Sequence, residues 1–148
     1  MKAFLSIKYH ADHGNRARIE MIAAALQSRG IAAVCIARDV EQWGARRFDP
    51  AELMRRTFAA IDACDLVVVD LTEKGVGVGI EAGYARAKNI PIVAIAETGA
   101  DISETLRGVS RTVFWYAGLD DLRGAIKEMI RNFPERCFDD ETNVRNQS

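Results

Sequence analysis

The sequence predicts a single α/β domain with a doubly wound, five-stranded parallel sheet in the flavodoxin-like, Rossmann-like order 2-1-3-4-5. Two observations lead to this prediction. Short apolar runs alternate with amphipathic segments along the chain, which is typical of a parallel sheet that helices cover on both faces. The chain has 148 residues, which suits one domain, and we find no internal repeat in it.

The strands are predicted from short runs that are rich in Val, Ile and Ala. We expect them at residues 3–7, 31–36, 66–69, 91–96 and 112–115. The helices are predicted from apolar residues spaced three or four apart, and Asp49 followed by Pro50 is a typical helix start. We expect helices at residues 15–29, 51–63, 80–88, 103–107 and 119–132. Residues 38–48 are predicted to form a loop, the domain to span 1–133, and a loose tail to follow over 134–148.

The composition excludes several classes of partner. The net charge is −1, which does not favour a nucleic-acid polymer or an anionic membrane. Three cysteines, Cys35, Cys64 and Cys137, follow no disulfide or zinc spacing, so we expect no metal or other cofactor. We find no signal peptide or membrane-length apolar run, and a reducing cytoplasm is the expected location.

The segment after the third predicted strand gives the strongest functional signal. The strand ends at Asp70, a stretch with glycines follows, and Glu81 comes near the start of the next predicted helix. Glycines let a ligand approach the backbone closely, and a helix N-terminus should keep Glu81 ionised beside that ligand. A carboxylate in that state can act as a nucleophile. A solvated glutamate at a helix start is the plainer interpretation, but it does not require the preceding glycines.

The predicted strand order brings a second loop to the same place. Strands 1 and 3 flank the switch point of the sheet, where ligands bind at the strand carboxyl ends. There Ser6 and Lys8 could bind an anionic group, and Tyr9 or His10 could stack on a base. Asp70 is expected to point into the same crevice, as a general acid or as a group that orients a sugar hydroxyl.

The glycines also match a dinucleotide-binding fingerprint. Residues 77–82 fit G-x-G-x-x-A, and Glu97 lies near the end of the next predicted strand. That fingerprint should directly follow the first strand of its unit. Here residues 71–76 intervene and the preceding strand is the third, so we do not favour this interpretation.

Residues 65–83, together with Ser6-Ile7-Lys8, resemble the nucleoside 2-deoxyribosyltransferase superfamily, which includes 2′-deoxynucleoside 5′-monophosphate N-glycosidases. Its members carry an apolar strand after an Asp, then a G-x-G-x-E-x-G run whose Glu is the nucleophile. Residues 77–83 match that run, and size and element order match over about residues 3–130.

The resemblance implies that Glu81 attacks the anomeric carbon of a (deoxy)ribosyl group and that another base or water completes the reaction. It implies that Asp70 or Asp65 assists, and that the partner is a small-molecule nucleoside or nucleotide. Family members are usually homo-oligomers. The expected substrate-binding residues are those of the first loop and the glycines: Ser6, Ile7, Lys8, Tyr9, Gly75, Gly77 and Gly79.

Two departures from the family pattern leave alternatives open. Thr57 stands where members usually have an Asp that helps with proton transfer, so either Asp62, Asp65 or Asp70 substitutes for it or the acid is absent. Gly75 stands where transferases tend to have Asp and monophosphate hydrolases Ser. A non-catalytic nucleotide-sensing module is therefore one alternative. A TIR-like NAD glycohydrolase is another, because residues 4–9 look somewhat like the opening of TIR domains.

Overall fold

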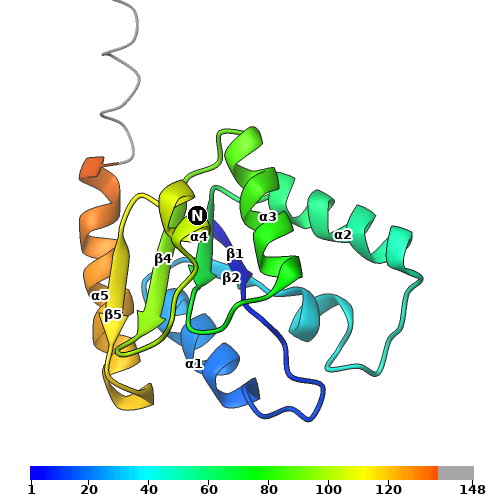
Figure 1. The fold of residues 1–148 in the computed structure, drawn as a ribbon, viewed down its shortest axis with the longest axis horizontal. Helices are drawn as coiled ribbons and strands as arrows, with labels where there is room; N and C mark the ends of the chain where they lie inside the picture. Colours follow the sequence, from blue (N-terminus) through cyan, green and yellow to red (C-terminus); the bar gives the residue numbers. More distant parts are fainter. Residues whose placement is uncertain (137–148) are drawn as a thin grey trace, which may run out of the picture.

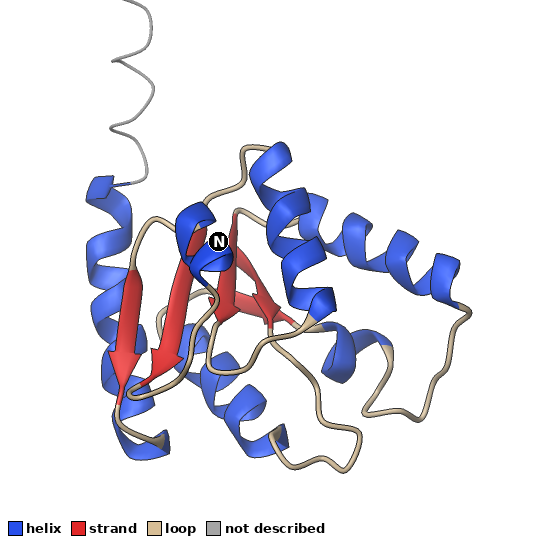
Figure 2. Ribbon diagram, in the orientation of Figure 1, coloured by secondary structure: helices blue, strands red, loops and turns tan. Residues whose placement is uncertain are grey.

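The computed structural model describes residues 1–136 and confirms the predicted α/β fold (Figure 1). One parallel sheet has the order β2-β1-β3-β4-β5, with helices on both of its sides (Figure 2). The strands are β1 (Lys2–Ser6), β2 (Ala32–Val34), β3 (Leu66–Asp70), β4 (Ile92–Glu97) and β5 (Val113–Tyr116). The helices are α1 (Arg16–Gln27), η1 (Ile36–Val40), α2 (Pro50–Asp62), α3 (Val76–Ala87), α4 (Glu104–Val109) and α5 (Leu119–Arg136).

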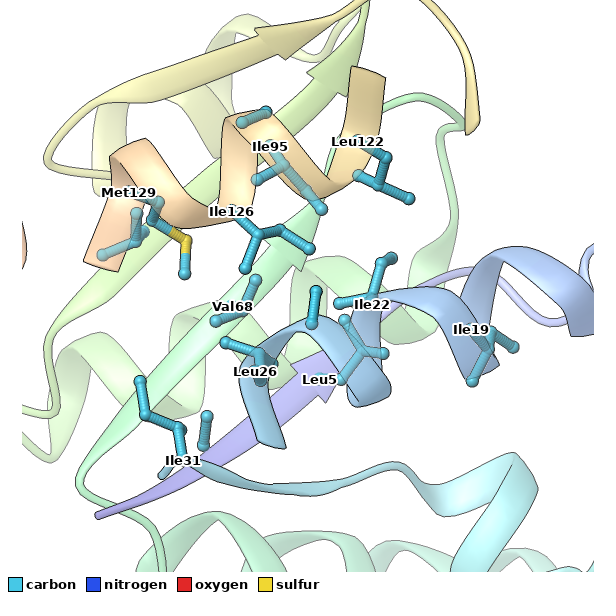
Figure 3. Packing of buried hydrophobic residues seen from close by; sticks show 14 of the residues in the cluster. Leu5, Ile19, Ile22, Leu26, Ile31, Val68, Ile95, Leu122, Ile126 and Met129 are labelled. Atoms are coloured by element: carbon cyan, nitrogen blue, oxygen red, sulfur yellow. The ribbon is translucent and has the colours of Figure 1, made fainter. Parts of the chain in front are cut away.

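One face of the sheet is covered by α1 and α5. Successive side chains of a strand point to opposite faces, so alternate strand residues belong to the same cluster. Leu5 and Val68 pack here with Ile22 of α1 and Ile126 of α5 (Figure 3). These residues are fully or almost fully buried, which provides much of the hydrophobic stabilisation of this layer.

The opposite face is covered by α2, α3 and α4. Phe4 and Val69 point to this side and pack in one cluster with Val78 and Ala82 of α3. Burial on both faces explains why the central strands are continuous apolar runs rather than alternating ones.

The parallel pairing brings the strand carboxyl ends to one edge. Ser6, the last residue of β1, pairs with Val69, and Asp70, the last residue of β3, pairs with Ile95. The arrowheads of β4 and β5 mark this edge at the bottom of Figure 1. The switch point between β1 and β3 therefore lies where the first loop and the β3–α3 loop meet.

Helix α3 begins earlier than the sequence predicts. It starts at Val76, so Gly77 and Gly79 lie inside its first turns and not in a loop. Gly75, in an extended conformation, is the residue before the helix. Because glycine has a low helix propensity, the sequence predicted a loop here. Burial of Val78 against the sheet nevertheless stabilises the first turn of the helix.

Other boundaries differ by small amounts. Strand β2 ends at Val34, and residues 36–40 form the π-helical turn η1 across the end of the predicted strand 31–36 and the start of the predicted loop 38–48. The Asp39 carboxylate holds this turn, since it accepts from the Cys35 backbone N–H at 2.8 Å. The Asp49 cap of α2 is confirmed, since its side chain accepts from the Glu52 N–H at 3.1 Å.

Helix α5 continues to Arg136, and the rest of the expected tail lies outside the described residues. Within residues 1–136, none of the helices combines the length and the apolar character that a membrane span requires.

Candidate active site

Glu81 lies on the buried face of α3 and not in the open first turn. It is three residues after Val78 and four before Ala85, both buried, so the helical repeat places it on the stripe that faces the sheet. Ser6 ends β1 and points to the same face as Phe4, toward α3. The Ser6 hydroxyl donates a hydrogen bond to Oε2 of Glu81. The structure thus joins the two residues that the sequence assigned to the nucleophile and to the first loop.

The surroundings of Glu81 make it less ionised than the sequence predicted. Burial raises the pKa of this carboxyl to about 7, although the hydrogen bond from Ser6 acts in the opposite direction. The sequence predicted an ionised group at a helix N-terminus. Because Glu81 is in the second turn, desolvation outweighs the dipole, and the carboxyl is only partly ionised at neutral pH.

The first loop divides its side chains between two sides. Ile7 and Tyr9 pack against the cluster beneath α1, and the Tyr9 ring lies 6.1 Å from the Trp43 ring. Lys8 points the other way, and its aliphatic stem lies over Gly75, where an added Cβ would be 3.6 Å away. Of the predicted loop contacts, the structure therefore brings Ser6 and Lys8 to the side of Glu81, while Ile7 and Tyr9 support the loop from the core.

A buried amide that the sequence analysis missed holds this loop in shape. The Asn15 side chain donates to the backbone carbonyl of Lys8 at 2.5 Å and accepts from the backbone N–H of His10 at 3.1 Å. Asn15 is 6% exposed. The sequence analysis made Asn15 the first residue of the predicted helix 15–29, and nothing in that pattern indicated that its side chain supports the first loop.

Asp70 is buried on the other face of the sheet. It alternates with Val69 and belongs to the side of Val68, where its Oδ2 accepts from the Tyr116 hydroxyl at 3.1 Å. Its Oδ1 accepts from the Thr72 backbone N–H at 2.9 Å. Burial raises the pKa of Asp70 above its usual value, although the hydrogen bonds from Thr72 and the charge of Arg18 act in the opposite direction. The structure does not set this carboxyl against Glu81.

The bonds around Asp70 form a network at the carboxyl ends of β3, β4 and β5. The Thr72 hydroxyl lies 3.0 Å from that of Tyr116 and accepts from the Glu97 backbone N–H at 3.0 Å. Arg18 of α1 donates to the Glu97 carboxylate at 2.8 Å. The network fixes the start of the loop that leads from β3 to α3. In this network the Glu97 carboxylate pairs with Arg18. The acid of a dinucleotide-binding fingerprint would instead bind the ribose of the ligand.

The remaining candidate acids lie away from Glu81. Asp65 is exposed at the amino end of β3, one strand length from Asp70, where it accepts from the Lys2 N–H at 2.7 Å. Asp62 accepts from the Tyr84 hydroxyl at the end of α2. Thr57 is buried and donates to the carbonyl of Leu53 in its own helix at 2.9 Å. The structure thus places Asp65 at the amino end of β3, the end opposite to Asp70 and to the last residue of β1, Ser6.

Gly77 and Gly79 lie on the open side of α3. A Cβ added at either would have no heavy atom within 4 Å, and the Gly79 N–H already donates to the Gly75 carbonyl at 3.2 Å. Gly79 instead lines an open groove of about 540 Å³ between α3 and α4, together with Val76 and Leu106. The residues that line this groove do not include Ser6 or Glu81, so it lies beside the carboxylate site. Among the described residues no group of three or more His, Cys, Asp or Glu could hold a metal ion.

Comparison with known proteins shows which family the chain is similar to. The model of the family described as nucleoside 2-deoxyribosyltransferase matches residues 7–146. A curated 2′-deoxynucleoside 5′-phosphate N-hydrolase homologue from Thermofilum pendens is 25% identical over 138 residues, which cover 90% of this chain and 96% of the relative.

Two solved structures share the fold. A CMP N-glycosidase from Clostridium botulinum superimposes with a TM-score of 0.65 at 19% identity, over 86% of this chain and 99% of the other. A 2-deoxyribosyltransferase from Bacillus psychrosaccharolyticus superimposes with a TM-score of 0.58 at 12% identity, over 83% of this chain and 90% of the other.

The chain belongs to the nucleoside 2-deoxyribosyltransferase family of enzymes. This membership confirms the resemblance, the enzyme class and the small-molecule nucleoside or nucleotide partner that the sequence predicted. Membership of the family also supports nucleoside deoxyribosyltransferase or N-hydrolase activity.

Substitution of Glu81 by Gln should remove a pH-dependent loss of stability. The folded pKa is raised to about 7, whereas an unfolded Glu titrates at about 4.3. Between these values the folded state binds more protons than the unfolded state, so the free energy of unfolding falls as pH rises. The wild type should therefore lose on the order of 3 kcal/mol relative to Glu81→Gln between pH 4 and 8. Urea unfolding of both proteins across this range measures it, with Glu104→Gln on the exposed side of α4 as the control. A difference that stays constant with pH would contradict the burial of Glu81.

Proposed function

We propose that this enzyme cleaves the N-glycosidic bond of a (deoxy)nucleoside or nucleoside 5′-monophosphate through a covalent glycosyl-Glu81 intermediate. The observation that supports the proposal is the Ser6–Glu81 contact at the switch point, where a carboxylate on α3 meets the end of β1. A partly buried carboxylate positioned in this way is suited to attack an anomeric carbon.

The reaction has two steps. Glu81 in its ionised form attacks C1′, the bond from C1′ to the base nitrogen breaks, and its electron pair leaves with the base, which takes up a proton. Water or a second base then attacks C1′, the bond to Glu81 breaks, and the carboxylate is regenerated. Because Ser6 holds Oε2, the hydrogen bond fixes the carboxyl plane and keeps part of the group ionised.

Two further residues position these groups. Asn15 holds the loop that carries Ser6 and Lys8. Asp70, through Thr72, fixes the chain that leads into α3, and we assign it a positioning role in place of a direct role in proton transfer. The named activities of the relative from Thermofilum pendens and of the Clostridium botulinum structure are hydrolytic, which favours water as the acceptor. The buried, unpaired thiols of Cys35 and Cys64 suit a reducing compartment, and we place the reaction in the cytoplasm.

Base release from substrate tests the proposal. The protein would be incubated with nucleosides, nucleoside 5′-monophosphates and NAD, with and without a second base, and free base would be followed by chromatography. Glu81→Ala should slow release by on the order of 10³-fold or more, because the nucleophile is lost. The exposed variant Glu104→Gln should match the wild type. Full activity in Glu81→Ala would refute the mechanism, and release from NAD alone would favour the TIR-like alternative.

We also propose that the enzyme is a homo-oligomer with α3 at the interface. Val76 is 83% exposed and Ile80 45% exposed, beside the groove between α3 and α4. Exposed large apolar side chains on one helix face favour a protein contact. Light scattering after size exclusion should give at least a dimer, and Val76→Asp should shift the mass toward one chain while Leu119→Asp does not. A wild type that is monomeric at micromolar concentration would contradict the proposal.

A further inference from the structure

Glu73 pairs with Lys8 and His10 of the first loop, next to the switch point. Its carboxylate lies 2.7 and 2.8 Å from Nε2 of His10 through its two oxygens, and 3.8 Å from Nζ of Lys8. Glu73 belongs to the loop from β3 to α3, whereas Lys8 and His10 belong to the first loop. The carboxylate therefore bridges the two loops that form the switch point.

The same place is otherwise suited to an incoming anion. The stem of Lys8 lies over Gly75, the residue before α3, and the first N–H groups of a helix have no partners inside it. An ammonium group, an imidazole and a helix N-terminus all favour negative charge. The chain supplies that charge itself, since the Glu73 side chain is ionised at neutral pH: the hydrogen bond from His10 and the charges of His10 and Lys8 lower its pKa.

A phosphate on the substrate would compete with this carboxylate. It would have to displace Glu73 from Lys8 and His10, or bind next to a like charge, and either route costs free energy. A substrate with a free 5′-hydroxyl meets no such repulsion. The contact is partly exposed, with side-chain exposures of 48% for Lys8, 31% for His10 and 36% for Glu73, so solvent screening limits the effect.

We propose that Glu73 is a specificity-determining residue that selects against a 5′-phosphate on the substrate. This inference rests on the proposed function, since it assigns the preference of that same site between nucleosides and nucleoside 5′-monophosphates. Neutralising Glu73 frees Lys8 and His10 for the phosphate and raises the affinity for monophosphates by about tenfold, a moderate value because the ion pair is partly exposed.

Binding in a background that does not turn over separates this inference from the reaction. Each protein would carry Glu81→Gln, and dissociation constants for the common 2′-deoxynucleosides and their 5′-monophosphates would be measured by calorimetry at low salt. Adding Glu73→Gln should tighten the monophosphates about tenfold and leave the nucleosides within about twofold. Adding Glu73→Asp, which keeps the charge, should retain most of the original preference.

The matched control is Asp101→Asn, which removes one negative charge from a neighbouring ion pair. Asp101 lies 2.7 Å from Nζ of Lys74, the residue that follows Glu73 in the chain. Its substitution should leave the affinities for monophosphates and nucleosides unchanged. An equal gain in Glu73→Gln and Asp101→Asn would overturn the inference, because it would show a general charge effect. The inference would also be overturned if Glu73→Gln left the ratio of the monophosphate and nucleoside dissociation constants unchanged, or if neither ligand bound.

Activity of the proteins that retain Glu81 then distinguishes the two proposals. If no base is released but the binding ratio moves as expected, the proposed reaction fails and the selectivity of Glu73 stands. If base is released with the same kcat/KM ratio for monophosphate and nucleoside in the wild type and Glu73→Gln, the reaction stands and the role of Glu73 is overturned.

Discussion

The hydrogen bond between Ser6 and Glu81 is the contact on which the arrangement of the site depends. It joins the end of β1 to the buried face of α3, two elements that meet because the strand order places β1 beside β3. A carboxyl in this position is withdrawn from water, so its pKa rises to about 7 and its charge becomes sensitive to what binds next to it. In the reaction that we propose, a bound sugar that excludes more water would raise the energy of that charge further, and attack on C1′ would neutralise it.

The sheet separates two polar groups that the sequence placed together. Ser6 and Glu81 lie on the side of α3, whereas the Asp70 carboxylate lies on the side of α1 and α5. Both occur at the same edge, and the alternation of side chains in β1 and β3 decides which face each one takes. Glu81 is therefore the carboxyl that the proposed reaction uses, and Asp70 is the one that stabilises the loops through Thr72 and Tyr116.

The approximate positions of the elements could be predicted because they depend on patterns within a few residues. The strand order could be predicted because regular strand–helix alternation favours a doubly wound sheet, for which 2-1-3-4-5 is a common order. That Ser6 and Glu81 lie close together could also be expected, since the switch point brings the first loop and the segment after the third strand to one place. The start of α3 was not, because glycines at 75, 77 and 79 suggested a loop, whereas packing of Val78 on the sheet forms the helix. The resemblance implicated Asp65, which the structure places at the amino end of β3, whereas Ser6 and Glu81 meet at the carboxyl ends of the strands.

The most direct test of the account is the covalent intermediate itself. The protein would be mixed with a 2′-deoxynucleoside or its 5′-monophosphate, quenched in acid within milliseconds, digested and analysed by mass spectrometry. The account predicts a deoxyribosyl or deoxyribosyl-phosphate adduct on the peptide that contains Glu81, and none in Glu81→Gln. Base release at the full rate with no adduct on that peptide at any time would show that water attacks the sugar directly, and would contradict the role assigned to Glu81.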